Sequence, residues 1–126
     1  MATLLAHIQI QPGKEDKWEA IMRDMVHHTF GTEEGVIRYE YWKGQEPLSY
    51  YCLLSFKDKW AFYHHQMSDH HEGHDFADVL AGITLEYIDP VKGAGGGLPP
   101  TTDPALPDDA SDAMKIAQER FPLAGA

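Results

Sequence analysis

Apolar and polar residues alternate with a period of two in the first segment of the chain, residues 3–10. The apolar side of that segment carries Leu4, Ala6, Ile8 and Ile10. Because successive side chains of a strand point to opposite faces, the alternation predicts a strand with one apolar face. The same reasoning predicts strands over residues 35–42, 48–56 and 83–88, and residues 43–47 supply the turn of a hairpin between the second and the third.

Helical spacing replaces the alternation between these strands. Over residues 14–29 one face recurs every three or four positions, and it holds Trp18, Ile21, Met22, Met25, Val26 and Thr29. This spacing predicts an amphipathic helix from about Lys14 to Thr29, with Gly31 as the residue just beyond its end. A second helix is predicted from Asp58 through Met67. Ser68 or Asp69 can cap a third, which would run from His70 to about Leu80.

The predicted order of elements is β-α-β-β-α-(α)-β. One antiparallel sheet with helices on one face satisfies this order, which indicates a ferredoxin-like α+β sandwich. Such a sheet leaves its other face bare, so that Leu5 or a row of aromatic residues would be exposed. We therefore expect a homodimer in which two sheets pack face to face.

The chain divides near Pro90 into two parts of different composition. Residues 1–91 form the predicted α+β domain, and residues 92–126 form a Gly/Pro-rich arm with a short C-terminal helix. In the arm, Asp108 to Phe121 has helical character, with one stripe made of Ala110, Met114, Ala117 and Phe121. A helix this short is marginal alone in water, so we expect it to dock on the domain or on the partner subunit.

The composition of the chain limits which binding partners and which cellular location are expected. The 126 residues carry a net charge of −10, which argues against nucleic acids and anionic membranes as partners. No apolar stretch is long enough to span a membrane, and residues 1–7 lack the features of a secretory signal. Cys52 is the one cysteine, so neither an internal disulfide nor a cysteine zinc site can form, and a cytoplasmic location is expected.

Four short segments resemble a known family. They are Ile8–Glu15 (IQIQPGKE), Gly35–Tyr41 (GVIRYEY), Leu54–Asp58 (LSFKD) and His65–His70 (HQMSDH). Over roughly residues 3–90 the chain resembles the antibiotic-biosynthesis-monooxygenase type of dimeric α/β barrel. The resemblance implies a small homodimer with the fold predicted above. It also implies chemistry on phenolic or polycyclic aromatics without a cofactor, although relatives include haem-degrading enzymes, polyketide cyclases and isomerases.

The resemblance also selects two histidines in a His-x-x-Ser-x-His pattern. It implies that His65 lines the pocket from a helix, and that His70, after the helix break, takes the position of a general base. Haem-degrading relatives carry Trp where this chain has His65 and Asn near His7, which argues against haem chemistry. A pocket and a helix start would both keep the His70 imidazole neutral, as a base for a phenol proton must be. The alternative for His70 is a solvated loop histidine.

Other polar and aromatic residues are candidates for substrate binding: His7, Tyr39, Tyr51, Phe62, His64 and His74. Each has a second interpretation, because His7 can lie on a dimer face, tyrosine rows are often core, and either His64 or His65 can face inward. His70 and His74 are spaced i, i+4, which can hold two metal ligands if a third comes from elsewhere. A single pair of this kind is common on acidic surfaces, so neither a metal nor an organic cofactor is predicted.

The sequence thus favours a small, cofactor-independent monooxygenase that binds a phenolic or polyketide-like aromatic, with His70 and His65 as catalytic residues. An oxygen-independent lyase, isomerase or cyclase could use the same histidine chemistry. A non-catalytic module that binds a metal or another ligand is the third interpretation.

Overall fold

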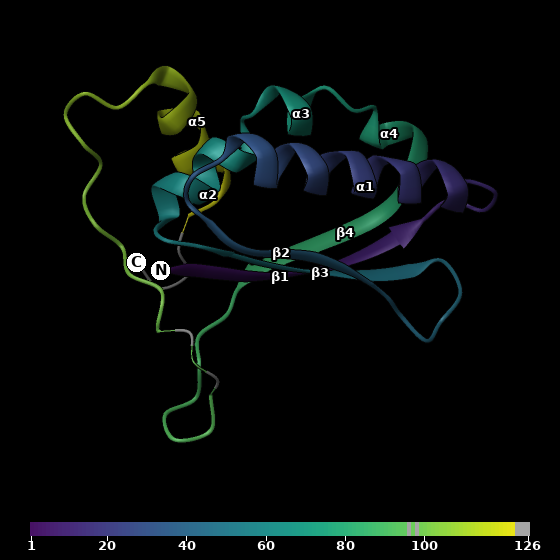
Figure 1. Cartoon of the computed structure of the whole chain (residues 1–126), viewed down its shortest axis with the longest axis horizontal. Coiled ribbons are helices and arrows are strands. Elements are labelled where there is room, and N and C mark those ends of the chain that lie inside the picture. The colour runs from purple at the N-terminus through teal and green to yellow at the C-terminus, as the bar shows by residue number, and fades with distance from the viewer. Residues whose placement is uncertain (96, 98, 123–126) are drawn as a thin grey trace.

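A four-stranded antiparallel sheet forms the centre of the molecule. The computed structural model describes residues 1–95, 97 and 99–122. The strand order is β2-β3-β1-β4, with β1 at Ala2–Ile10, β2 at Val36–Lys43, β3 at Ser49–Phe56 and β4 at Leu80–Tyr87. All labelled helices lie on one side of this sheet (Figure 1). The predicted ferredoxin-like α+β fold is therefore confirmed, and within one chain the sheet is open rather than closed into a barrel.

Five helices accompany the sheet in the described part of the chain. They are α1 at Glu15–Thr32, α2 at Lys59–Gln66, α3 at Asp69–Glu72, α4 at Phe76–Val79 and α5 at Asp112–Arg120. The prediction of one helix over residues 70–80 was wrong, because the chain breaks between α3 and α4. Glycine is a poor residue for a helix interior, and Gly73 ends α3 with its N–H on the Asp69 carbonyl at 2.8 Å. No described helix is long and apolar enough to cross a membrane.

The two faces of the sheet differ as the alternation in β1 predicts. Leu4, Ala6, Ile8 and Ile10 are buried toward the helices, and their neighbours on β3 and the apolar face of α1 complete the core. On the opposite face the rings of His7 and Tyr51 stack with centroids 4.5 Å apart. Trp42, paired with Tyr51 across β2 and β3, is 57% exposed there.

A close approach at Gly35 joins the loop after α1 to α2. A Cβ atom at position 35 would lie 2.4 Å from the Cβ of Ala61, which is far closer than real side chains come. The loop also accepts a hydrogen bond at the Gly35 carbonyl from the Lys57 N–H, at 2.8 Å. Gly35 therefore packs directly against the start of α2.

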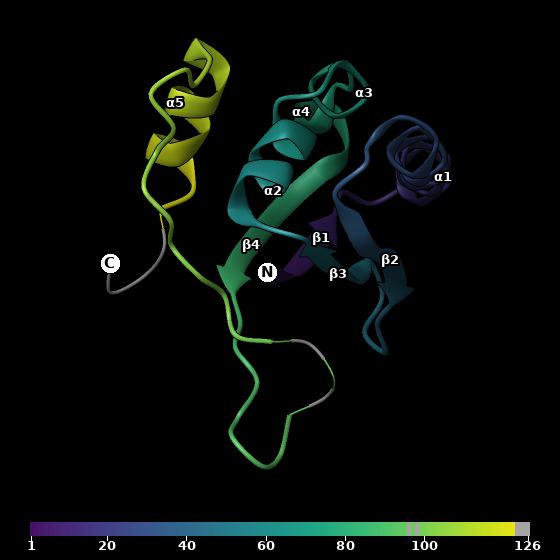
Figure 2. The same cartoon turned by 60° about the vertical axis from the view of Figure 1, so that its left-hand side comes forward.

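The C-terminal arm returns to the domain and docks α5 beside α2 (Figure 2). Ser111 caps α5 by accepting from the Met114 N–H at 3.1 Å, and Ala117 on its inner stripe is fully buried. The hydroxyls of Tyr63 and Tyr87 both donate to the Phe121 carbonyl, at 3.2 and 2.9 Å. Of the two alternatives for this helix, docking on the domain or on the partner subunit, the structure shows contact with α2 of its own chain.

Candidate active site

A cavity of about 300 Å³ lies between the sheet and the helices. Most of its wall is apolar or aromatic, and a few polar side chains gather on one part of it: Tyr39, Tyr41, His65, Gln66 and His71. No described lysine or arginine lines it. A mostly apolar cavity with a few convergent polar groups is the usual form of a small-molecule site.

His65 is the most deeply buried titratable group on this wall. The Asp58 side chain caps α2 by accepting from the Ala61 N–H at 2.8 Å, and His65 follows two turns into the helix with none of its surface exposed. Its Nδ1 lies 3.1 Å from Oε2 of Glu33, whereas its Nε2 is buried without a protein partner. Of the two neighbours that the sequence left open, the buried one is His65, and His64 is exposed.

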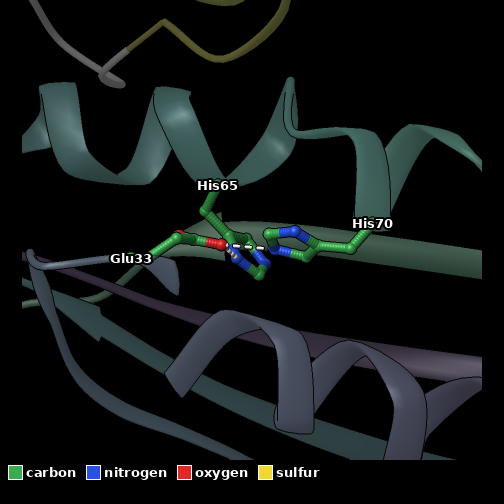
Figure 3. A group of neighbouring side chains, drawn as sticks. All are labelled: Glu33, His65 and His70. Atoms are coloured by element: carbon green, nitrogen blue, oxygen red, sulfur yellow. Dashed lines mark hydrogen bonds and ion pairs between the residues drawn. The ribbon is translucent and has the colours of Figure 1, made fainter. Parts of the chain in front are cut away.

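Glu33 connects two histidines at the end of α1. As the C-cap residue its N–H binds the Thr29 carbonyl at 2.9 Å, and its Oε2 accepts from His65 Nδ1 at 3.1 Å and from His70 Nε2 at 2.5 Å. Figure 3 shows the three side chains converging. The Thr29 hydroxyl lies 3.3 and 3.2 Å from the same two nitrogens.

The charge of Glu33 determines which nitrogen of His65 is free. Burial, the largest cause, raises the pKa of this carboxyl, but its interactions with His65 and His70, hydrogen bonding first, together outweigh burial and hold the pKa below its usual value. The ionised carboxylate can only accept, so Nδ1 of His65 must donate to it. In the neutral ring the lone pair of His65 is then on Nε2, which has no partner within the described protein.

His70, the expected base, lies on the other side of Glu33. It is not among the residues that line the cavity. Its side chain is 13% exposed, and it borders a surface hollow together with Asp24, His28, Asp69, Gly73 and His74. Its contact with the cavity is therefore indirect, through the carboxylate that it shares with His65.

His71 is a cavity residue that the sequence reasoning missed. Its Nδ1 is buried without a partner, and its ring centroid lies 5.2 Å from that of His65. Burial, the largest cause, lowers the pKa of His71 to about 3, so the ring is neutral near pH 7. Trp18 lines the same cavity and also has a buried, unpartnered Nε1.

The remaining candidates from the sequence are spread over the molecule. Tyr39 lines the cavity and shares a 2.6 Å hydrogen bond with Tyr41, and burial raises the pKa of both phenols. Phe62 is fully buried against Phe56 and Phe121. Three more lie away from the cavity: His7 and Tyr51 are on the open face of the sheet, and His74 pairs with Asp24 at the surface. His64 lies beside Trp60 in a separate hollow.

Comparison with known proteins agrees with this architecture. The solved structures that resemble the chain include a candidate antibiotic biosynthesis monooxygenase from Caulobacter crescentus, at 24% identity and a TM-score of 0.66, covering 71% of this chain and 89% of that one. Another candidate from Bacteroides thetaiotaomicron has 19% identity and a TM-score of 0.66, with 71% and 89% covered. A Pseudomonas aeruginosa protein has 21% identity and a TM-score of 0.63, with 69% and 90% covered.

These identities show a shared fold and no more. A search of curated proteins finds no significant match. The family model described as antibiotic biosynthesis monooxygenase, however, matches residues 1–74, which is more than half of the chain. The protein is thus a small member of the antibiotic biosynthesis monooxygenase family.

Proposed function

We propose that this protein is a cofactor-independent monooxygenase that oxidises a small phenolic or polyketide-like aromatic, with His65 as the general base. The observation that carries the proposal is the state of His65. It is fully buried, it lines an apolar cavity, Glu33 holds its Nδ1, and its Nε2 has no partner. A buried imidazole oriented by a carboxylate, with its free nitrogen available to a bound molecule, is the arrangement that general-base catalysis needs.

The first step is removal of a phenol or enol proton by Nε2 of His65. Glu33 stabilises the imidazolium that forms, because its carboxylate already accepts from Nδ1. His70 donates to the same carboxylate oxygen, so it acts as a positioning residue rather than as the base itself. The apolar wall of the cavity strengthens these interactions, because a bound substrate would displace solvent that screens them.

Oxygen then serves as the oxidant of the electron-rich anion. The phenolate transfers one electron to O2, the resulting radicals combine, and loss of water leaves a quinone. A phenol with a free ring C–H thus reacts with one O2 to give the quinone and one water, and all four electrons come from the substrate. The Trp18 N–H and the neutral His71 ring, both unpartnered on the wall, would stabilise the oxygen atoms of substrate and product.

Oxygen dependence is the decisive test. The full chain would be assayed against a panel of hydroxylated one- and two-ring aromatics in an oxygen electrode, with product followed by mass spectrometry. We expect consumption of one O2 per product and incorporation of one 18O atom from labelled O2. Product that forms unchanged under anaerobic conditions would refute the oxygenase and favour a lyase, isomerase or cyclase that uses the same base.

The functional unit that we propose is a homodimer. The open face of the sheet carries the exposed Trp42 and Tyr51, and a second copy packed on it would cover these rings. We expect a dimer in analytical ultracentrifugation and a monomer for a Trp42→Asp, Tyr51→Asp double variant. A monomeric wild-type chain at micromolar concentration would refute this part of the proposal.

The proposal also includes a cytoplasmic location. The single cysteine, Cys52, is a buried thiol, as is usual for a protein of a reducing compartment.

The arm has a place in the same proposal, as the part of the chain that closes the cavity. Phe121 at the end of α5 lines the cavity and packs on Phe62, with ring centroids 5.3 Å apart. Shortening the chain after Pro107 removes this wall, and we expect about tenfold weaker binding of the substrate, for the loss of part of one buried aromatic side chain. Unchanged affinity in a folded, truncated dimer would exclude a closing role.

A further inference from the structure

Three metal-ligating side chains from separate parts of the fold converge beside the cavity. Glu33 follows α1, His65 belongs to α2, and His70 belongs to α3. One carboxylate oxygen and one ring nitrogen from each histidine all lie within 4.8 Å of one another. Two imidazoles and a carboxylate form a ligand set that divalent transition metals bind well.

We propose that Glu33, His65 and His70 bind a divalent transition-metal ion such as Zn²⁺ or Co²⁺, and that the ion turns His65 from a proton acceptor into a proton donor in the cavity. The metal site itself does not depend on the proposed oxygenase activity. Its effect on the reaction rests on that proposed function.

The distances require only small movements. Bonds of about 2.1 Å in a tetrahedral site place neighbouring ligand atoms about 3.4 Å apart. Oε2 of Glu33 now lies 3.1 Å from Nδ1 of His65 and 2.5 Å from Nε2 of His70. His70 is carried by a four-residue helix at the surface, so a shift of about 1 Å would admit the ion. The Thr29 hydroxyl lies within 3.3 Å of both nitrogens and borders the same space.

The present hydrogen bonds leave one group of the cluster unsatisfied. Oε1 of Glu33 is buried and has no partner. An unpaired, buried carboxylate oxygen costs free energy that a bound cation would recover. The cluster also has a route to solvent, because His70 borders the surface hollow that contains the acidic side chains of Asp24 and Asp69. Such a hollow favours the entry of cations.

The effect on His65 follows from the chemistry of imidazole. A metal binds the unprotonated nitrogen, so an ion on Nδ1 leaves the single proton of the neutral ring on Nε2. Without the ion, Nδ1 donates to Glu33 and Nε2 holds the lone pair. Binding therefore replaces the acceptor beside the cavity with an N–H donor, and a ring in this state cannot remove a proton from a phenol.

The binding test uses the full chain, free of any affinity tag and stripped of metals with a chelator. Zn²⁺ is titrated by calorimetry, and Co²⁺ is titrated by visible absorption, which reports its coordination. We expect one ion per chain, with affinity weakened at least about tenfold in both His70→Gln and Glu33→Gln. His74→Gln is the matched control, since His74 borders the same hollow but pairs with Asp24.

Two results would overturn the site. One is the absence of saturable Zn²⁺ or Co²⁺ binding at micromolar concentrations. The other is a loss of affinity in His74→Gln equal to that in His70→Gln, which would place the ion in the surface hollow. Circular dichroism of each variant confirms that it is folded before its affinity is compared.

The tautomer is read separately by 15N NMR of labelled histidines. Without metal, we expect the His65 spectrum of a proton on Nδ1 and a bare Nε2. With one equivalent of Zn²⁺, we expect a proton on Nε2. A bare Nε2 in the zinc-saturated protein would overturn the switch. Calorimetry and NMR need no substrate, so failure of the oxygenase proposal and failure of this one are distinguishable. If the oxygenase is found, one equivalent of Zn²⁺ should lower its rate at least about tenfold.

Discussion

Two pairs of histidines in this molecule differ sharply in their surroundings. The inner histidines, His65 and His71, line the cavity, and each has a buried nitrogen without a partner. The outer histidines, His28 and His74, both pair with Asp24, at 3.1 and 2.9 Å. Their side chains are 47% and 21% exposed. The same side chain therefore has a buried nitrogen without a partner in one place, and a carboxylate partner with access to solvent in the other.

This difference shows why the crowding of histidines is a poor guide to their role. An exposed ion pair between a histidine and a carboxylate contributes little, because water screens it and would satisfy both partners anyway. A buried nitrogen without a partner costs stability, and such a cost is usually tolerated where a ligand supplies the missing bond. Chemistry in this molecule is therefore to be sought at the inner histidines.

The strongest test of the comparison is a pair of matched substitutions. We expect His65→Gln to lower the turnover of a phenolic substrate by about 10²–10⁴-fold, the usual contribution of a general base. His74→Gln should leave turnover unchanged. The measurement is O2 uptake at saturating substrate, with thermal unfolding as a check on folding. Equal rates for the two variants would break the distinction between inner and outer histidines.

The next effect concerns Glu33, whose carboxylate accepts hydrogen bonds from His65 and His70. Glu33→Ala leaves His65 and His70 without their acceptor, so we expect a loss of about 2 kcal/mol in the free energy of unfolding. Urea denaturation measures it. Glu34→Ala is the control, because Glu34 is exposed and adjacent in the chain. A loss of the same size in both variants would show that Glu33 acts through the loop rather than through the histidines.

The third substitution is expected to stabilise the protein rather than destabilise it. His71→Phe replaces a ring with a buried, unsatisfied nitrogen by an apolar ring of similar shape. We expect the free energy of unfolding to rise by about 1 kcal/mol, while substrate binding weakens because one hydrogen-bonding group leaves the cavity wall. Urea denaturation and ligand titration of the same samples check both halves. A less stable variant with unchanged affinity would contradict them.

The smallest change in the free energy of unfolding is expected for Asp24, the partner of the two outer histidines. Asp24→Asn removes the charge that both outer histidines contact, and the free energy of unfolding should change by less than about 0.5 kcal/mol, as for exposed ion pairs. Turnover should not change. A drop of several kcal/mol would mean that the outer histidines support the fold in a way that their exposure does not suggest.

Periodicity predicted the fold well because the fold depends on which faces are apolar. The alternation in residues 3–10 and the spacing of Trp18, Met22 and Met25 each marked a buried face that the structure confirms. A bare opposite face followed from the same pattern. These properties are local, so a single sequence contains them.

The site was less predictable for two physical reasons. Helical phase ends with α2, so spacing from His65 does not say whether His70 or His71 faces inward after the break. Glu33 lies 32 residues from His65 in the chain, and only the tertiary packing of the loop brings them together. No periodic pattern records a contact of that kind.

The packing of this loop on α2 depends on the lack of a side chain at Gly35. At position 35 the main chain passes so near Ala61 that any side chain would force the two segments apart. Glu33 is two residues away in the same short loop. The position of its carboxylate relative to His65 therefore depends on how closely Gly35 approaches Ala61. The hydrogen bond that sets the tautomer of His65 therefore depends on the close packing at Gly35, two residues from Glu33.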